Sequence, residues 1–335
     1  MRVGVLRLLV IALALLPAIA AAEPISLKLS FFSSDRSVSY LGAVKPFVDA
    51  VNAEAKGLVK IEVSFSGVLG KDIAHQPQFV LDGTADIAFV APGYTPDAFP
   101  DNTIVELPGL FRDMREATFT YTQLIAANAL KGYKNFFVIG AYVPEPATIH
   151  GRVSIQSIDD LKNKRIRVNN PSEATALEKL GAIPVQMPIN QIANALSSGN
   201  IDAAEVSKTA LSDYGIIRVA THHFFLGTNG APLALLMNRK RFEALPAAAQ
   251  DIIRKYSGEW AAKRFNDIFL VSDEQVMEQL RSDPGRTLVF PSQQDLEVAH
   301  SAFASVIAEW AARSAHNKEL LNLAEAAIVK LRKAE

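Results

Sequence analysis

From residue 25 onward, segments with a period of two alternate with segments of helical spacing, and this alternation restricts the fold more than any other feature. Apolar residues alternate with polar ones over residues 25–31 and again over residues 59–65, as in strands that bury one face. Between them, apolar residues recur at helical spacing from Val44 to Val51, and Pro46 suits the first turn of a helix. These residues therefore predict a β-α-β unit, and the continued alternation predicts an α/β fold.

A turn with the same pattern occurs twice. Residues 80–86 and 196–202 both read as the end of a helix, a glycine, two further residues and an aspartate. Glycine supplies the left-handed backbone that ends a helix, and aspartate binds backbone N–H groups at turns. With 335 residues, the chain has the length of two domains of roughly 150 residues. The repeated turn therefore suggests two lobes of similar construction, although ordinary turn chemistry explains it equally well.

The longest helical pattern follows Leu245-Pro246. No further proline interrupts it before Leu280, and Gly258 is its one glycine. An unbroken helix of this length would extend roughly 50 Å, which is longer than one lobe and enough to brace two. Pro284-Gly285 marks its end. No low-complexity linker separates the halves, so we expect the chain to cross between the lobes more than once.

Residues 1–22 have the order of a secretory signal peptide. Arg2 and Arg7 precede the apolar run 8–16, and Pro17 and a small-residue stretch follow. The apolar run is short for a membrane span, and an uncleaved anchor is the alternative. The chain has no cysteine, which excludes disulfides, thiolate metal sites and a lipid-modified N-terminal cysteine. We therefore expect a periplasmic protein that is exported through its N-terminal signal.

Composition and motifs argue against several functions. The net charge of −1 lacks the basic excess of a nucleic-acid-binding protein. No Gly-x-Ser-x-Gly, phosphate-loop or Gly-x-Gly-x-x-Gly pattern is present. His222 and His223 are adjacent and would point apart, so they cannot share a metal by themselves. We expect no catalytic residue, metal or cofactor, although an enzyme whose groups meet only in space stays an alternative.

Residues 157–170 carry the most distinctive local pattern. A short helical turn leads to a short strand in which Arg165 and Arg167 share one face and Ile166 and Val168 share the other. Arginine at a strand end beside a cleft suits a carboxylate, because its planar fork donates two parallel hydrogen bonds and keeps its charge. A surface arginine or a structural ion pair is the alternative interpretation.

Several short motifs recur in one order behind the signal-like segment. They are Gly83-x-x-Asp86, the stretch 99–111 that ends in Leu-Pro-Gly-Leu-Phe, the stretches 161–168 and 180–187, the turn 195–202, and Leu245-Pro246 before the long helix. In this combination the chain resembles the solute-binding proteins of the tripartite ATP-independent periplasmic (TRAP) transporters, the DctP-type family. The resemblance covers essentially everything after residue 22.

The resemblance implies a two-lobed α/β solute-binding fold that closes on its ligand, with a long helix spanning both lobes. We expect lobe 1 to comprise residues 23–143 and 230–280, and lobe 2 to comprise residues 144–229 and 281–335. The ligand would be an organic acid, delivered to TRAP permease subunits that use an ion gradient and no ATP. The carboxylate-binding arginine of the family falls on Arg167.

The chain departs from the sugar-acid binders of this family. Val206 follows Asp202-x-x-Glu205, where those proteins often have asparagine, and Ala91 and Tyr94 stand where they carry glutamate and arginine. A further arginine is replaced by Ala147. The pocket should therefore be less polar than a sialic-acid pocket. The aromatic candidates, each of which suits a packed core equally well, are Phe32, Tyr94, Tyr142, Phe224 and Phe225.

These observations predict seven ligand-binding residues: Arg167, Tyr94, Ala91, Phe32, Tyr142, Val206 and Phe225. The leading hypothesis is a binder of a monocarboxylate with an apolar or aromatic body. A small polar oxo or hydroxy acid, or a dicarboxylate, is the alternative within the class. A periplasmic enzyme on the same scaffold and a ligand sensor for a membrane receptor are the alternatives outside it.

Overall fold

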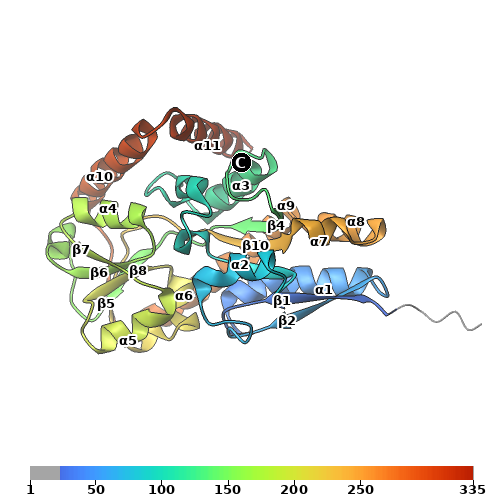
Figure 1. Cartoon of the computed structure of the whole chain (residues 1–335). Helices are drawn as coiled ribbons and strands as arrows, with labels where there is room; N and C mark the ends of the chain where they lie inside the picture. The colour runs from blue at the N-terminus through green and yellow to red at the C-terminus, as the bar shows by residue number, and fades with distance from the viewer. Residues whose placement is uncertain (1–22, 335) are drawn as a thin grey trace, which may run out of the picture.

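The computed structural model describes residues 23–334, which form two β-sheets surrounded by helices (Figure 1). The signal peptide expected at residues 1–22 lies outside the described residues. The first sheet has the order β2-β1-β3-β10-β4, and the second has the order β11-β9-β5-β8-β6-β7. The chain is therefore an α/β protein with one sheet in each of two lobes.

The first sheet mixes parallel and antiparallel neighbours. β1 is parallel to β2 and β3, whereas β10 is antiparallel to β3 and β4. The predicted β-α-β unit is confirmed as β1, α1 and β2, with proline in the first turn of α1. The strands of this sheet are β1 (Ile25–Ser30), β2 (Val59–Ser64), β3 (Ile87–Val90), β4 (Phe136–Tyr142) and β10 (Leu233–Asn238).

The second sheet has a parallel core of three strands. β6 is parallel to β7 and β8, while β5 runs antiparallel to β8 and β9. β11 adds to β9 in parallel at the edge. The strands of this sheet are β5 (Thr148–Gly151), β6 (Arg165–Val168), β7 (Ile183–Gln186), β8 (Ala203–Val206), β9 (His222–Phe224) and β11 (Thr287–Val289).

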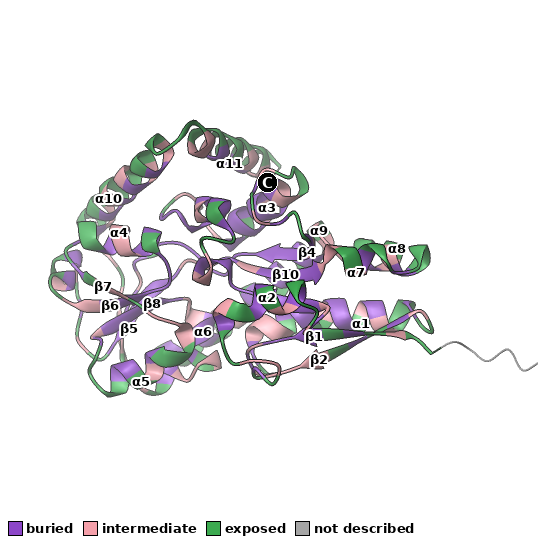
Figure 2. Cartoon of the chain, in the orientation of Figure 1, coloured by how far each residue is buried: buried purple, intermediate pink, exposed green. Residues whose placement is uncertain are grey.

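Helices cover the sheets, and Figure 2 shows that they bury one side and expose the other to solvent. The central strand β3 is buried along its whole length, because apolar clusters pack on both faces of the first sheet. The α-helices are α1 (Lys45–Glu54), α2 (Gln76–Leu81), α3 (Met114–Ala126), α4 (Pro171–Lys179), α5 (Ile192–Ser197), α6 (Lys208–Asp213), α7 (Arg239–Glu243), α8 (Ala247–Lys255), α9 (Glu259–Ser282), α10 (Gln293–Ala312) and α11 (Ala315–Lys333).

The repeated turn performs the same task in each sheet. Gly83 and Gly199 adopt φ values of 81° and 72°, which favour glycine. The carboxylate of Asp86 accepts a hydrogen bond from the amide of Lys28 in β1 at 2.8 Å. The carboxylate of Asp202 accepts one from the amide of Arg165 in β6, also at 2.8 Å. Each aspartate thus ties the start of its own strand to a neighbouring parallel strand, so this part of the two lobes is built alike.

The long helix expected over residues 246–280 is broken at Gly258. That residue has φ 61° and ψ −124°, so α8 ends before it and α9 begins after it. α9 alone extends about 36 Å at 1.5 Å per residue. Phe265 and Phe269 of α9 pack in the core of the first lobe, and Leu280 packs in that of the second. The expected helix that spans both lobes is therefore present as α9.

The C-terminal helices also join the lobes, arching over the molecule in Figure 1. Phe303 of α10 packs in the second lobe, whereas Leu320 and Ala324 of α11 pack beside α3 of the first. Residues 281–335, expected together in the second lobe, are thus divided between the two. The apolar stripe of α11 is buried by α3, which places it on the first lobe.

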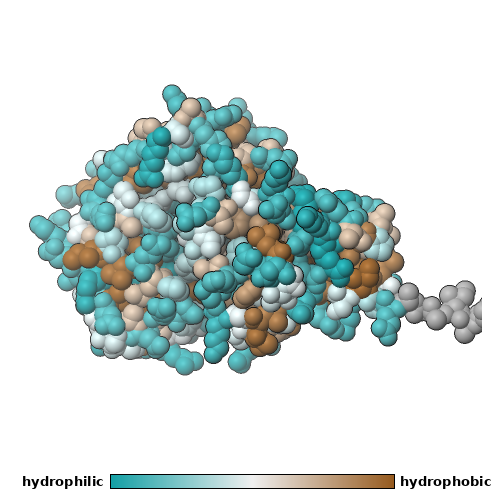
Figure 3. Space-filling model, in the orientation of Figure 1, coloured by the Kyte–Doolittle hydropathy of each residue, from teal (hydrophilic) through white to brown (hydrophobic). Residues whose placement is uncertain are grey.

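Among residues 23–334, no helix is long and apolar enough to cross a membrane. On the face that Figure 3 shows, polar side chains cover most of the surface and separate small apolar patches.

Candidate functional site

A cavity of about 70 Å³ lies between the two lobes. The carboxyl ends of β1 and β3 in the first sheet face those of β6 and β8 in the second, and residues at or just after these ends line the cavity. Ligands in open α/β sheets bind at this edge, because loops that follow the strands converge there. The order of the strands therefore places the cavity where the strand ends of the two sheets meet.

Arg167 forms the charged wall of the cavity. It lies in β6, where alternation turns Ile166 and Val168 into the apolar core of the second lobe. Its side chain is only 2% exposed, although it lines the cavity. A guanidinium buried this deeply needs hydrogen-bond partners, since an unpaired buried charge is strongly destabilising.

Four of the five N–H groups of Arg167 have partners in the protein. Nε donates to the carbonyl of Met187 at 2.9 Å, and Nη1 donates to the carbonyl of Glu205 at 3.1 Å. Nη2 donates to the Tyr94 hydroxyl at 3.1 Å and to Asn169 Oδ1 at 3.2 Å. These bonds fix the plane of the guanidinium and leave one N–H of Nη1 for a ligand.

Three buried glutamates lie on or behind this wall: Glu173 and Glu205 interact with the charge of Arg167, and Glu106 interacts with that of Glu173. Glu173 accepts hydrogen bonds from the amide of Asn169 and from the side chains of Asn170 and Asn229. Burial raises the pKa of Glu173, and the charge of Arg167 opposes that rise. The geometry thus places a hydrogen-bonded carboxyl group directly behind the arginine.

The other two glutamates each keep one oxygen without a hydrogen-bond partner. Glu205 contacts the Thr228 hydroxyl through its other oxygen. Burial raises the pKa of Glu205 well above its usual range, and the charge of Glu173 adds to this rise. The same two causes raise the pKa of Glu106 to about 8. Near neutral pH Glu106 is therefore held mainly in the neutral form, and burial also disfavours the charged form of Glu205.

The first lobe supplies most of the apolar wall. Phe32 follows β1, Ala91 follows β3, Leu233 begins β10 and Phe269 comes from α9. Val206, at the end of β8, adds an apolar surface from the second lobe. The site therefore pairs one cation with an apolar surface, and hydroxyl and carboxyl groups such as those of Thr209 and Asp213 also line the cavity.

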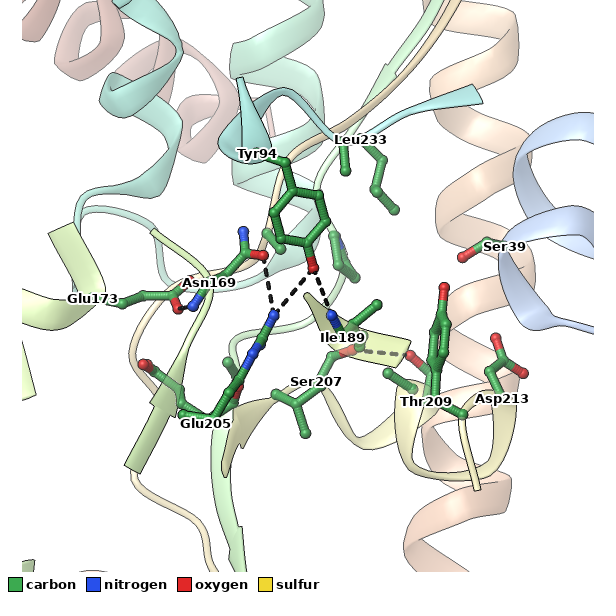
Figure 4. Close-up of a pocket in the computed structure, with 18 of the residues that line it drawn as sticks. Ser39, Tyr94, Asn169, Glu173, Ile189, Glu205, Ser207, Thr209, Asp213 and Leu233 are labelled. Carbon is green, nitrogen blue, oxygen red and sulfur yellow. Dashed lines mark hydrogen bonds between the residues drawn. The ribbon is translucent and has the colours of Figure 1, made fainter. Parts of the chain in front are cut away.

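Two contacts join the lobes at the cavity. Tyr94 ends η3 (Pro92–Tyr94) in the first lobe, and its hydroxyl accepts hydrogen bonds from Arg167 and from the amide of Ile189 at 3.0 Å. Asp213 ends α6 in the second lobe. The amide of Val38 donates hydrogen bonds to its carboxylate, at 3.1 Å to Oδ1 and 2.9 Å to Oδ2. Figure 4 shows Tyr94 reaching toward Ile189 across the cavity. The lobes are therefore held together by polar groups from both sides.

A glycine permits the close approach of the Tyr94 segment. A Cβ atom on Gly93 would lie 2.5 Å from Glu106 Oε1 and 2.9 Å from Asn169 Nδ2. Any larger residue would push η3 away from the second lobe, and Tyr94 with it.

The structure brings five of the seven candidate residues together around the cavity: Arg167, Tyr94, Ala91, Phe32 and Val206. It places the other two elsewhere. Tyr142 is buried in the core of the first lobe and stacks on Phe265 at 4.8 Å between ring centroids. Phe225 follows β9 and stacks on Phe290 at 4.9 Å, because its amide continues the pairing with β11.

Sequence reasoning did not select several residues of the cavity wall. Asn169 and Glu173 belong to a recognisable helix start, in which Asn170 caps α4, but that pattern carries no sign of a binding site. Asp213 and Leu233 had no distinguishing signal. They reach the cavity because α6 and β10 are placed there by long-range packing.

Comparison with known proteins gives a consistent result. Residues 29–314 match the family described as bacterial extracellular solute-binding protein, family 7, named DctP. One relative is the C4-dicarboxylate-binding periplasmic protein DctP of Rhodobacter capsulatus, 25% identical over 287 residues that cover 80% of each chain.

Two solved structures are similar over nearly the whole chain. A TRAP solute-binding protein from an unidentified marine microbe, specific for aromatic acid ligands and in complex with metahydroxyphenylacetate, is 27% identical with a TM-score of 0.84, covering 91% of this chain and 99% of that one. A TRAP solute-binding protein from Rhodoferax ferrireducens T118, in complex with copurified benzoate, is 25% identical with a TM-score of 0.85, covering 92% and 99%.

Proposed function

The chain belongs to the DctP family of bacterial extracellular solute-binding proteins, and from that premise we propose that it captures a monocarboxylic acid with an apolar or aromatic body. Members of this family are transport proteins that bind small organic ligands for TRAP permeases. In the proposed role, the chain is exported through residues 1–22 and delivers its acid to permease subunits driven by an ion gradient.

One observation carries the choice of ligand. Among the described residues that line the cavity, Arg167 is the only lysine or arginine, and the first lobe opposes it with an apolar wall. A single buried guanidinium matches one carboxylate. Apolar side chains favour an apolar ligand body, because removing apolar surface from water is favourable. A second carboxylate would lose its water without a second cation among these lining residues to replace it.

The structural relatives support the same ligand class. Both solved structures described above hold an aromatic acid, and both cover nearly the whole chain. Solved structures with bound succinate or uronates are 17–19% identical to this chain and show only that the fold is shared. The C4-dicarboxylate-binding relative is 25% identical, so the choice between a monocarboxylate and a dicarboxylate rests on the cavity.

Calorimetric titration of ligand-free protein tests the proposal. We expect benzoate or phenylacetate to bind and succinate and glucuronate to give no signal under the same conditions. Tight binding of glucuronate or succinate without a response to the aromatic acids would refute the ligand class. Turnover of the bound acid would instead identify an enzyme.

The transport role has its own test. Deleting the gene should abolish uptake of the labelled acid by cells, and restoring the full chain should recover it. The periplasmic form should begin near Ala21 or Glu23 when its N-terminus is sequenced. Full uptake in the deletion strain would contradict the transport role.

A further inference from the structure

We propose that the cavity contains a second polar subsite, formed by Asp213 and Ser39, that binds a hydroxyl group on the body of the ligand and rejects a second carboxylate. This inference rests on the proposed function and narrows its ligand to a hydroxy-substituted aromatic monocarboxylate. Both residues line the same cavity as Arg167.

The two polar groups lie away from the charged wall. Figure 4 shows Ser39 and Asp213 on one side of the cavity, with Asn169, Glu173 and Glu205 on the other. Ser39 precedes η1 (Tyr40–Val44) in the first lobe, and Asp213 ends α6 in the second. A ligand whose carboxylate meets Arg167 would therefore extend its far end toward this pair.

The carboxylate of Asp213 is positioned but not saturated. Its two oxygens accept a hydrogen bond from the amide of Val38, and the backbone of Ser39 also bonds to the carboxylate, so the side chain is fixed against the opposite lobe. A carboxylate offers about four acceptor positions, so it can accept a ligand hydroxyl as well. Ser39 lines the same cavity, and Figure 4 shows its hydroxyl oxygen directed toward the cavity. One fixed acceptor and one adaptable hydroxyl thus face the same space.

The charge of Asp213 determines which ligand groups this part of the cavity rejects. Burial raises the pKa of Asp213 to about 6, so the group is still largely ionised at neutral pH. The nearest lysine on α6, Lys208, forms an ion pair with Asp273 at 2.9 Å. A second ligand carboxylate would therefore meet an anion in a partly desolvated site, which disfavours binding, whereas a hydroxyl would donate to it.

The test compares three acids that share one ring and one carboxylate: benzoate, 3-hydroxybenzoate and isophthalate, which has a carboxylate in place of the hydroxyl. By calorimetry at pH 7.5, we expect 3-hydroxybenzoate to bind about tenfold more tightly than benzoate, the value of one hydrogen bond to a charged acceptor. Isophthalate should bind more weakly than benzoate. If benzoate binds at least as tightly as 2-, 3- and 4-hydroxybenzoate, the subsite does not exist.

Variants separate the subsite from the contact between lobes. Asp213→Asn removes the charge and weakens the bond to Val38, so it is expected to reduce the affinity for every acid. Only the subsite predicts that it also lowers the preference for 3-hydroxybenzoate over benzoate and relieves the rejection of isophthalate. Ser39→Ala should lower the hydroxyl preference alone, and Ser212→Ala, on the exposed side of α6, should change neither.

An equal loss of affinity for all three acids in Asp213→Asn would overturn the proposal and leave Asp213 as a contact between lobes. The result also distinguishes this inference from the function on which it rests. If benzoate binds but the ratios are unchanged by both variants, only the subsite is wrong. If no aromatic acid binds to the wild-type protein, the proposed function fails and the subsite fails with it.

Discussion

The two walls of the cavity differ in what they contribute to a ligand. The wall from the second lobe is built around Arg167, whose hydrogen bonds to Met187 and Glu205 are made within that lobe. The wall from the first lobe is mainly apolar, and its one polar group at Arg167 is the hydroxyl of Tyr94. In the proposed role, charge recognition is preorganised in one lobe, and the other lobe supplies the shape that meets the body of the ligand.

This difference teaches how one fold can serve many acids. A carboxylate is common to all of them, and in the proposed role the fixed guanidinium of Arg167 would bind it whatever the rest of the ligand. The body of the ligand varies, and the apolar side chains that meet it can be exchanged without disturbing the buried charges. Removing the arginine should therefore affect every acid, and changing the opposite wall should affect only some.

The largest expected effect comes from breaking the charged wall. Arg167→Ala should weaken binding of any acid by about 2–5 kcal/mol, the range observed when one partner of a buried charge pair is removed. Arg167→Lys should also bind poorly, because an ammonium group lacks the planar fork. Calorimetry measures both losses.

Arg165→Ala provides the matched control on the same strand. Its guanidinium is half-exposed and pairs with Asp202 at 2.8 Å, outside the cavity. This variant should bind nearly as well as the wild type. A folded Arg167→Ala protein with wild-type affinity would remove Arg167 from the site.

The buried glutamates behind that wall predict a dependence of stability on pH. Burial raises the pKa of Glu106 to about 8 in the folded chain from an ordinary value of 4.5, so the folded state binds more protons than the unfolded chain between these values. The contribution of Glu106 to the free energy of unfolding is therefore complete at low pH. It falls as the pH rises toward 8, by at most about 1.4 kcal/mol per pH unit. Denaturant unfolding at several pH values measures the slope.

Glu106→Gln should remove this contribution, because a neutral amide has no proton to lose. Glu325→Gln, on the exposed face of α11, should leave the slope as it is. Equal slopes in the wild type and Glu106→Gln would show that the carboxyl group is not kept neutral by burial.

A smaller effect is expected where the two walls meet. Tyr94→Phe removes the hydroxyl that joins Arg167 to the amide of Ile189, and it leaves two donors without that acceptor. Binding should weaken by about 1–3 kcal/mol, the cost of a donor left unsatisfied. Tyr40→Phe, which also removes a hydroxyl from the first lobe but lies outside the cavity, should bind normally. Equal affinities for the two variants would show that the Tyr94 hydroxyl does not support closure.

The smallest effect should come from the apolar wall, and it should be selective. Leu233→Ala removes apolar contact at the start of β10, where the side chain is only partly buried. Affinity for benzoate should fall by about 1 kcal/mol, since part of a leucine side chain is lost from the interface. Acetate, which is too short to need this wall, should bind as weakly as it does to the wild type. A comparable loss for both acids would contradict the division of roles between the walls.

The sequence was sufficient for the parts of the fold that depend on local patterns. The alternation over residues 25–65 predicted β1, α1 and β2, and the repeated turn anticipated the matching roles of Asp86 and Asp202. The pattern in residues 165–168 predicted that Arg165 and Arg167 share one strand face, but it did not show that Arg165 pairs with Asp202 near the surface while Arg167 is buried at the cavity.

Long-range packing explains what the sequence could not provide. Tyr142 lies in a strand covered on both faces, so its spacing does not tell whether it points to the cavity or to the core. Gly258 suited a helix interior by pattern, but its positive φ ends α8. Glu106 comes from η4 (Pro100–Glu106), where nothing in the local sequence distinguishes a buried carboxyl group from an exposed one.

The most direct test of the account is a crystal structure of the chain with bound benzoate. The central claim is that the second lobe holds the carboxylate while the first covers the ring. We expect the carboxylate within hydrogen-bond distance of Arg167 Nη1, and the ring between Phe32, Leu233 and Val206. A carboxylate bound away from Arg167, or a ring that contacts only the second lobe, would contradict the claim.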